Sequence, residues 1–242
     1  MPKAIIVGAT SGIGKEVALQ LLAKGWELGI AGRRTERLEE IKAQAPQRIH
    51  TRRIDVRSND AASDLLALIA DLGGMDLYIH CSGVGCQNIE LNPDAELNIV
   101  ATNVDGFVKL VDCAFSYFLG NSGGHLCIIS SIAGTKGLGA AAAYSASKRY
   151  QNTYLDALAQ LSRMQRLDIR ITDIRPGFVD TPLLREGKYP MLMRPEKVAA
   201  RIVRALEQRK RRIVIDRRYA VLVFFWRLIP EWLWERLPIR TK

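Results

Sequence analysis

A tyrosine and a lysine four residues apart, Tyr144 and Lys148, are the most chemically informative pair in the chain, and Ser131 precedes them. If residues 143–164 form a helix, Tyr144 and Lys148 lie one turn apart on the same face. An ammonium group favours ionisation of a neighbouring phenol, which otherwise titrates near pH ~10. Ser131 follows the apolar run 126–129 and could bring a hydroxyl to the same place. The three side chains predict a site that polarises a carbonyl group and donates a proton to it.

A glycine-rich turn near the start of the chain predicts a phosphate-binding site. Residues 3–7 form an apolar run typical of a strand, and Val17, Leu21 and Leu22 follow with helical spacing. Glycines let the backbone approach a ligand closely, and a helix N-terminus attracts anions. The turn between strand and helix therefore forms a cradle for phosphate. Its residues are Gly8, Thr10, Ser11, Gly12, Ile13 and Gly14.

Further motifs follow in a characteristic order. Asp55 and Val56 come after the third predicted strand, Asn103 lies in a Thr-Asn-Val run, and residues 175–181 read Arg-Pro-Gly-Phe-Val-Asp-Thr. This order resembles that of the short-chain dehydrogenase/reductase superfamily, and the resemblance covers residues 3–216. It implies a single-domain, NADP(H)-dependent oxidoreductase with a Ser-Tyr-Lys-Asn active site.

The resemblance also implies roles for individual residues. The catalytic residues would be Ser131, Tyr144, Lys148 and Asn103. Asn103 would position a water that links Lys148 to solvent. Besides the glycine turn, the cofactor would contact Asp55, Val56, Ser82, Gly83, Asn103, Tyr144, Lys148, Pro176, Gly177, Val179 and Thr181.

One motif departs from the family pattern. His80-Cys81-Ser82-Gly83 stands where Asn-Asn-Ala-Gly is usual after the fourth strand. Gly83 still lets the backbone pass close to the adenosine ribose. The hydrogen bonds that an asparagine would give to the sheet would have to come from His80 or Ser82. We expect a local variation with the activity retained.

The pattern of strands and helices predicts an α/β protein. Strand-like segments are predicted over 3–7, 27–31, 48–54, 76–80, 124–130, 169–174 and 212–216. Amphipathic patterns predict helices over 12–24, 34–44, 60–72, 98–118, 143–164 and 195–208. This alternation is typical of a single-domain Rossmann fold, a doubly wound, seven-stranded parallel sheet with helices on both faces. The domain would span residues 1–216.

The end of the second strand predicts the cofactor. An acidic residue there would bind the 2′-hydroxyl of NAD, but the chain has Gly32, Arg33 and Arg34. Gly32 leaves room for a 2′-phosphate, and Arg33 can pair with it as a two-pronged donor. Ser11 could add a hydroxyl donor. The sequence therefore predicts NADP(H) in preference to NAD(H).

Composition argues against several other classes of protein. The four cysteines, Cys81, Cys86, Cys113 and Cys127, form no Cys-x-x-Cys pair and no disulfide framework, and no secretory signal precedes the first strand. Both features predict a cytoplasmic protein with free thiols. The three histidines match no metal-ligand spacing, so we expect no metal site.

The C-terminal segment, residues 217–242, is expected to be separate from the domain pattern. Residues 161–242 carry 20 Lys and Arg against 9 Asp and Glu, and three of the four tryptophans lie in the tail. The segment could pack on its own domain or a partner subunit, lie in a membrane surface, or cover the substrate pocket. Residues 209–237 combine basic and aromatic side chains, which suits peripheral contact with the inner face of a membrane. The apolar run 219–226 is too short to span a bilayer.

Partners and function follow from these features. The resemblance implies a homodimer or homotetramer formed through helices 98–118 and 143–164. The basic cluster carries no nucleic-acid recognition motif. Small residues over 134–143 and apolar residues over 183–193 predict a hydrophobic substrate. The predicted activity is NADPH-dependent reduction of a ketone, such as a lipid or acyl-chain ketone, or oxidation of the corresponding secondary alcohol.

An alternative function is that of a non-catalytic NADP(H)-binding regulator or scaffold on the same fold. Such proteins usually lose part of the catalytic set. Here Ser131, Tyr144, Lys148 and Asn103 are all present, which favours the enzyme.

Overall fold

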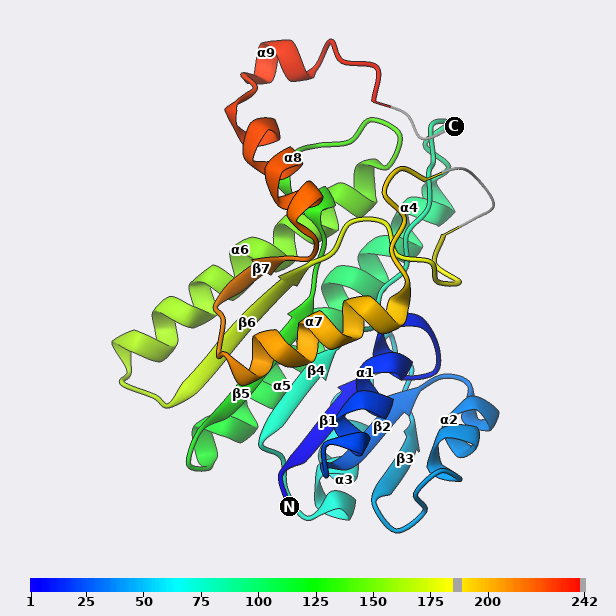
Figure 1. The fold of residues 1–242 in the computed structure, drawn as a ribbon, viewed down its shortest axis with the longest axis vertical. Helices are drawn as coiled ribbons and strands as arrows, with labels where there is room; N and C mark the ends of the chain where they lie inside the picture. The colour runs from blue at the N-terminus through cyan, green and yellow to red at the C-terminus, as the bar shows by residue number, and fades with distance from the viewer. Residues whose placement is uncertain (185–188, 240–242) are drawn as a thin grey trace.

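Seven parallel strands form the centre of the computed structural model, which describes residues 1–184 and 189–239 (Figure 1). The strands are β1 (Lys3–Val7), β2 (Glu27–Gly32), β3 (Ile49–Arg53), β4 (Leu77–His80), β5 (Gly124–Ile129), β6 (Ile169–Arg175) and β7 (Arg212–Val214). Their order is β3-β2-β1-β4-β5-β6-β7, so the direction of winding changes between β1 and β4. Such a switch opens a crevice at the carboxyl ends of the strands. The predicted Rossmann fold is confirmed.

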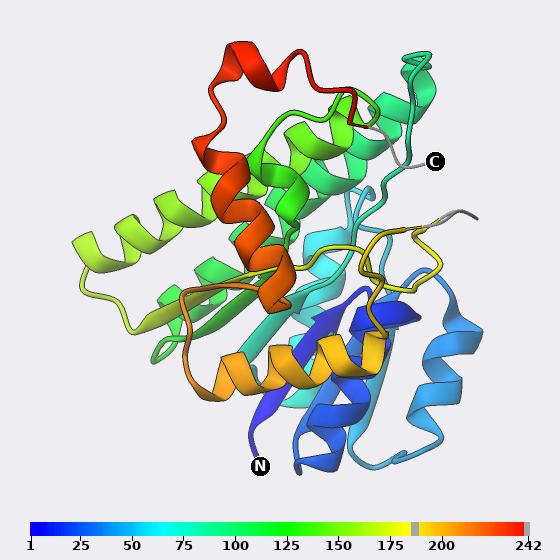
Figure 2. The same ribbon diagram turned by 45° about the horizontal axis from the view of Figure 1, so that its top comes forward.

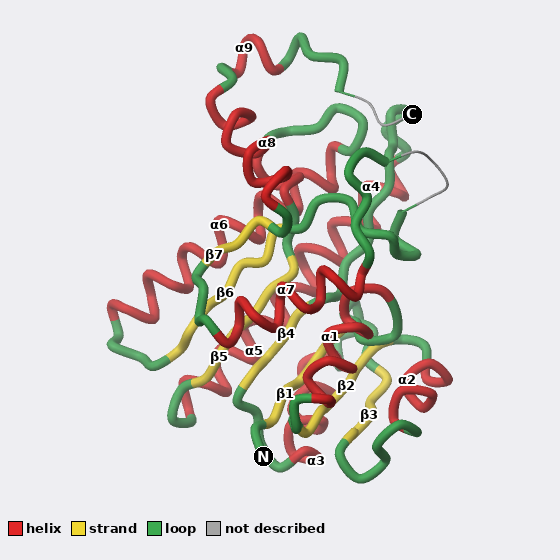
Figure 3. Tube along the Cα trace, viewed as in Figure 1, coloured by secondary structure: helices red, strands yellow, loops and turns green. Residues whose placement is uncertain are grey.

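Helices cover both faces of this sheet (Figure 3). They are α1 (Gly12–Ala23), α2 (Thr35–Lys42), α3 (Ala61–Leu72), α5 (Gly106–Gly120), α6 (Ala142–Met164) and α7 (Pro195–Glu207). Side chains of β1 alternate between two cores: Ala4 and Ile6 pack with α1 and α7, whereas Ile5 and Val7 pack with α3 and α5. Figure 2 shows α1 and α7 together on one face. Burial on both faces explains the almost uninterrupted apolar character of β1.

The helix predicted over 98–118 begins earlier than expected, as α4 (Pro93–Val100). The Asn92 side chain accepts hydrogen bonds from the first backbone N–H groups of α4, and Pro93 occupies the first turn. Apolar periodicity could not find this start, because Ile99 is the one buried residue of α4.

A π-helical turn at Ala101–Asp105 joins α4 to α5. The Gly106 N–H donates to the carbonyl of Ala101, five residues earlier. Asn103 lies at the centre of this turn and is completely buried. Turns of this kind are rare and occur frequently at functional sites.

The chain ends in two helices, α8 (Arg217–Leu228) and α9 (Glu231–Trp234), which lie above the carboxyl ends of the strands (Figure 1). Strand β7 ends at Val214, two residues before the end predicted for it at 216, because Asp216 turns with a φ of 79° and caps α8. Among the described residues, no helix combines the length and apolar character needed to cross a membrane.

Hydrogen bonds made by Tyr219, Trp234 and Lys136 hold the C-terminal segment against the rest of the chain. The Tyr219 hydroxyl donates to the Pro190 carbonyl at 2.7 Å. Trp234 Nε1 donates to the carbonyl of Gly137 at 2.7 Å, and Lys136 Nζ donates to that of Ile229 at 2.8 Å. Through these bonds residues 219–234 pack against the rest of the described chain, and contact with a partner subunit or a membrane stays a prediction. Residues 240–242 lie outside the described part.

Candidate active site

One cavity of about 930 Å³ runs along the carboxyl ends of the strands. Every residue predicted to bind the cofactor lines it except Asn103, and Ser131 lines it as well. Asn103 lies behind the wall, although its neighbour Thr102 reaches the cavity. The fold thus brings the glycine turn and the Ser131, Tyr144 and Lys148 side chains to one space.

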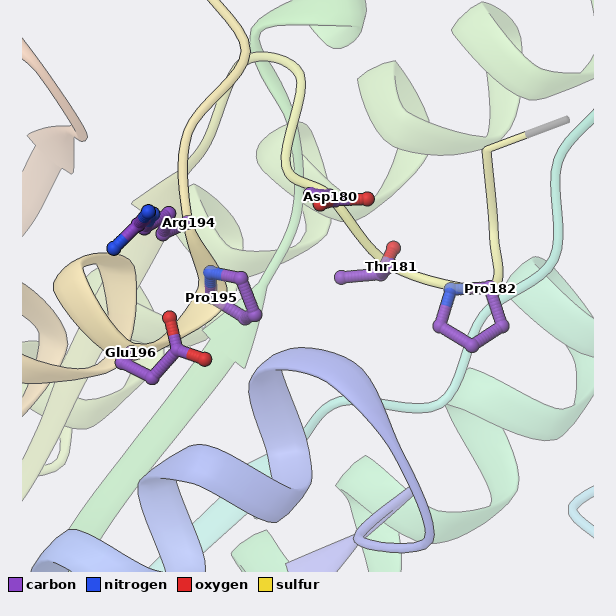
Figure 4. Close-up of a pocket in the computed structure, with 6 residues that line it drawn as sticks. All are labelled: Asp180, Thr181, Pro182, Arg194, Pro195 and Glu196. Atoms are coloured by element: carbon purple, nitrogen blue, oxygen red, sulfur yellow. The ribbon is translucent and has the colours of Figure 1, made fainter. Parts of the chain in front are cut away.

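A second hollow of about 570 Å³ adjoins this cavity (Figure 4). Its lining residues are Asp180, Thr181, Pro182, Arg194, Pro195 and Glu196. Thr181 and Pro182 line both spaces, so the hollow is a side branch of the larger cavity. The larger space contains the phenol, the ammonium and the glycine turn, and we take it as the site.

The glycine turn depends on glycine for close backbone packing. Gly8 has a φ of 90°, and its N–H donates to the Ala31 carbonyl at 2.9 Å. A Cβ on Gly14 would collide with the Gly8 carbonyl. Only glycine fits both positions, and the turn leads directly into the N-terminus of α1, where backbone N–H groups attract anions.

The two arginines after β2 have different environments. Arg34 Nη2 donates to Thr10 Oγ1 at 2.7 Å and to Ser11 Oγ at 2.8 Å, so Arg34 braces the glycine turn. Arg33 is exposed, lines the cavity and makes no hydrogen bond within residues 1–184 and 189–239. A Cβ on residue 32 would lie 2.6 Å from a methyl group of Thr10, which explains the glycine there.

Asp55 forms a charged pair at the same end of the cavity. Its carboxylate accepts a hydrogen bond from Arg57 Nη2 at 2.8 Å. Hydrogen bonds from Arg57 lower the pKa of Asp55 to about 2, so the carboxylate is ionised at neutral pH.

Ser131, Tyr144 and Lys148 meet where β5 ends and α6 begins. Lys148 Nζ lies 5.9 Å from the centre of the Tyr144 ring and donates to the Ile129 carbonyl at 3.2 Å. Ser131 Oγ lies against the Pro176 carbonyl and caps the 3₁₀ turn that follows it. The spacing predicted from the sequence therefore produces the expected cluster.

The pKa of Tyr144 moves in the direction opposite to the one expected from Lys148. Removal of the phenol from water raises the pKa of Tyr144, and a hydrogen bond with Ser131 acts in the opposite sense. Burial of Lys148 lowers the pKa of its ammonium to about 8. The sequence showed the charge of Lys148 beside Tyr144 but not the burial of the phenol. Burial is the main cause of the shift in the pKa of Tyr144. Tyr144 is consequently protonated at neutral pH, as a proton donor must be.

Asn103 supports the site from behind. Its side chain accepts from the Val84 N–H at 2.9 Å and donates to the Val84 carbonyl at 2.8 Å. It also donates to Ser147 Oγ at 3.0 Å. These bonds fix the segment after β4 to the π-helical turn, which positions the wall of the cavity.

The His80 variation is accommodated inside the protein. His80 Nδ1 is hydrogen-bonded to the Tyr78 hydroxyl at 2.9 Å, and its ring packs edge-on against Phe107. Burial lowers the pKa of His80 to about 3, so the imidazole is neutral. The histidine therefore fills a core position without bringing a charge to the site.

Several side chains near the site escaped the sequence interpretation. Gln151, one helical turn beyond Lys148, accepts a hydrogen bond from Lys148 Nζ at 3.0 Å. Leu222, Trp226 and Ile239 of the C-terminal segment line the cavity. Helical spacing from Lys148 could have pointed to Gln151. For the C-terminal segment, the sequence left open that it covers the substrate pocket but did not single out these three residues.

The apolar segment after Thr181 lines the cavity only in part. Met191, Leu192 and Met193 lie off the cavity, and Met193 is buried in the core. The four cysteines are free thiols. Within the described residues, no three His, Cys, Asp or Glu side chains gather as metal ligands would.

A doubly wound sheet with a glycine turn and a Tyr-Lys pair at one cavity defines a class of dinucleotide-dependent oxidoreductases. A family model described as short chain dehydrogenase matches residues 2–189. The chain belongs to the short-chain dehydrogenase/reductase family. It is accordingly an NAD(P)-dependent oxidoreductase that acts on CH–OH or C=O groups.

Relatives agree with this assignment. An uncharacterized oxidoreductase of Myxococcus xanthus (strain DK1622) is 34% identical over 194 residues, covering 78% of this chain and 76% of the relative. An uncharacterized oxidoreductase of Mycobacterium tuberculosis (strain ATCC 25618 / H37Rv) is 30% identical over 250 residues, covering 99% of this chain and 96% of the relative.

Solved structures share the fold. A short-chain dehydrogenase from Streptomyces avermitilis superposes with a TM-score of 0.82 at 22% identity, covering 94% of this chain and 92% of that one. An actinorhodin polyketide ketoreductase variant, solved with NADPH, gives a TM-score of 0.77 at 24% identity, covering 88% and 95%.

Proposed function

We propose that the protein is an NADPH-dependent reductase of ketones with a large apolar group. The observation that carries this proposal is the meeting of a protonated Tyr144, Ser131 and Lys148 in the cavity that also contains the glycine turn. A reductase needs a proton donor beside the substrate oxygen, and Tyr144 has the required protonation state at neutral pH.

The residues of the cavity fit NADP(H). The glycine turn and the N-terminus of α1 suit the pyrophosphate, and Arg33 is available for the 2′-phosphate. Lys148 and Asp55 also line the cavity, and we propose that they hold a ribose hydroxyl and the adenine end of the cofactor. NADPH, when bound, supplies a hydride from C4 of its nicotinamide.

The protein supplies the proton and the orientation. Ser131 and Tyr144 hydrogen-bond the substrate oxygen, which makes the carbonyl carbon more electrophilic. Tyr144 would give its phenolic proton to that oxygen when the bound cofactor supplied hydride to the carbon, and the product would be a secondary alcohol. The resulting phenolate is stabilised by the nearby Lys148 ammonium until it regains a proton from solvent.

The walls beyond the phenol favour an apolar substrate. Leu138, Ala140 and Ala141 form one side of the cavity, and Leu222 and Trp226 of α8 form another. We propose that residues 1–216 bind the cofactor and carry the catalytic groups, and that residues 217–242 shape the substrate pocket. Apolar walls with few polar groups suit a lipid or acyl-chain ketone.

A panel of ketones with increasing alkyl chain length tests the function, with loss of reduced-nicotinamide absorbance as the readout. We expect turnover with NADPH and a specificity that rises with chain length. Tight NADPH binding without turnover of any ketone would instead favour the non-catalytic regulator.

Trp226→Ala should selectively impair long substrates. The Trp226 ring contacts that of Trp234, with centres 5.4 Å apart, and lines the cavity. Loss of this apolar wall should raise KM for long-chain ketones by about tenfold or more and change KM for short ketones little. Steady-state kinetics with both ketones check this, and Phe224→Ala, on the outer face of α8, is the matched control. Equal losses for short and long ketones would contradict a wall role.

We propose that the outer face of α8 contacts an anionic membrane surface. Val221, Phe224, Phe225 and Leu228 are 56–63% exposed, while Tyr219 and Val223 of the same helix are buried. The exposed residues form a face of α8 directed away from the core. Large apolar groups in water at such exposure mark an interaction site.

Charge favours lipid over a second copy of the chain at this face. Arg217 and Arg227 lie on α8 and are exposed, and Arg236 stacks over the exposed Trp232 ring at 5.5 Å. Two copies meeting through this face would bring like charges together, whereas an anionic bilayer would attract them. Homo-oligomers, which we also propose, would then form through α5 and α6, away from α8.

The double substitution Phe224→Ser and Phe225→Ser tests this contact. Both side chains are exposed, so folding should be retained, whereas truncation after Asp216 would remove Tyr219 and Val223 from the core. Sedimentation with vesicles of phosphatidylcholine and phosphatidylserine should show salt-sensitive binding of the wild type and about tenfold weaker binding of the variant.

Two controls accompany the vesicle experiment. Neutral phosphatidylcholine vesicles should bind the wild type weakly, and light scattering should give the same oligomeric mass for both proteins. Unchanged vesicle binding by the variant would refute the membrane contact, and a loss of oligomeric mass would assign the face to subunit pairing.

A further inference from the structure

The side-chain amide of Gln151 links Lys148 to the backbone of Asn103, where the family resemblance implies a linking water. Gln151 is 0% exposed and lies on α6, three residues after Lys148. Its Oε1 accepts from Lys148 Nζ at 3.0 Å, and its Nε2 donates to the Asn103 carbonyl at 2.9 Å. The bridge therefore runs from the catalytic lysine to the π-helical turn.

The partners fix the orientation of this amide. An ammonium can only donate a hydrogen bond, and a backbone carbonyl can only accept one. The carbonyl end of the Gln151 side chain must therefore face Lys148, and the NH₂ end must face Asn103. A flipped amide would place two donors and two acceptors against each other in a buried site, at a large energetic cost.

The bridge also determines how Lys148 points. Its ammonium has three N–H groups, of which one donates to the Ile129 carbonyl and one to Gln151. The third remains for the cavity that Lys148 lines. The hydrogen bonds to Ile129 and Gln151 thus direct the third N–H group toward the cavity, where the ribose of the proposed cofactor would bind.

We propose that Gln151 is a positioning residue for Lys148, and that its side-chain amide takes the place of the bridging water implied by the family resemblance. This inference rests on the proposed reductase function. A water can pass a proton along because its oxygen both donates and accepts O–H bonds. A neutral amide cannot release an N–H proton at neutral pH, so the proton that restores Tyr144 must arrive from the cavity side.

The charge of Lys148 provides the readout. The ionisable groups that face it are Tyr144 on α6, Asp173 on β6, His80 on β4 and Cys81 beyond β4. Burial lowers the pKa of Lys148 to about 8, while Asp173 and Cys81 act to raise it. Below that pH the ammonium can donate to a ribose hydroxyl, and above it the amine donates less strongly. NADPH affinity should consequently fall as pH rises through the pKa of Lys148.

Two substitutions should move this transition in opposite directions. Gln151→Met keeps the length of the side chain but removes the acceptor, which disfavours the ammonium and shifts the transition down by about one pH unit. Gln151→Glu keeps an acceptor and adds a negative charge, which shifts it up by about one unit. Fluorescence titration of NADPH from pH 6 to pH 10 measures both shifts, and the alkaline limb of the kcat profile should follow them.

Ser162→Ala is the matched control. Ser162 is a buried polar residue of the same helix, and its hydroxyl donates to the Ile169 carbonyl far from Lys148. This variant should lose some stability but keep the wild-type pH transition. A merely structural role for Gln151 would make its variants behave like Ser162→Ala, and that result would overturn the proposal.

The binding titration also separates this inference from the proposed function. It needs no turnover, so opposite shifts in NADPH binding without ketone reduction would retain the role of Gln151 and reject the reductase. Turnover with unshifted transitions in both variants would do the reverse. Either variant alone decides the matter if the other does not fold.

Discussion

Tyr144→Phe is expected to lower kcat for ketone reduction by about two to four orders of magnitude while leaving NADPH binding nearly unchanged. The substitution removes one hydroxyl, the proposed proton donor, and keeps the ring that faces Lys148. Because the donor acts in the transition state, its loss should reduce kcat more than it raises KM. Stopped-flow measurement of NADPH oxidation under saturating ketone gives the rate directly.

The control for this experiment is Tyr150→Phe on the same helix. Tyr150 is 38% exposed and stacks on Tyr154 outside the cavity. It should keep the wild-type rate. Near-normal turnover by the Tyr144 variant would remove the phenol from the mechanism.

Arg33→Ala is expected to weaken NADPH binding by roughly ten- to a hundredfold, on the order of 1.5–3 kcal/mol for a charge-assisted hydrogen-bonded pair. Affinity for NADH should change little, because NADH has no 2′-phosphate. Arg33 makes no hydrogen bond within the described chain, so its removal breaks none there, although it takes a positive charge away from Asp55. Isothermal titration with both cofactors measures the difference.

Arg37→Ala is the matched control for Arg33. Arg37 lies on α2, pairs with Glu40 at 2.9 Å and does not line the cavity. It should leave both affinities unchanged. Similar losses for NADPH and NADH in the Arg33 variant would show that the residue maintains the fold and does not select the cofactor.

Local patterns in the sequence were enough to predict the fold and the cluster at the site. The central strands β1, β4 and β5 are largely apolar. The glycine turn and the Tyr144–Lys148 spacing are features of neighbouring residues, and turn and helix geometry fixes where those residues lie. Ser131 could be predicted as well, because parallel strands deliver the residues after them to one edge.

The features that could not be predicted depend on contacts between distant segments. Gln151 contacts the Asn103 carbonyl, which is 48 residues away in the sequence. Trp226 lines the cavity because the fold brings α8 to the ends of strands that lie far from it in the sequence. The upward shift in the pKa of Tyr144 depends on how much protein surrounds the phenol. No pattern among the residues next to Tyr144 in the sequence indicates that burial.

The π-helical turn at Ala101–Asp105 has a consequence for changes in chain length. Such a turn contains one residue more than an α-helical turn over the same stretch. A deletion of one residue there would close the turn into an ordinary α-helical one and leave the two flanking parts close to their present orientation. The Asn103 carbonyl would then join the regular hydrogen bonds of the helix and turn away from Gln151, although the proposed catalytic side chains remained encoded. A single-residue deletion in this segment should therefore uncouple Gln151 from the site while the fold is kept.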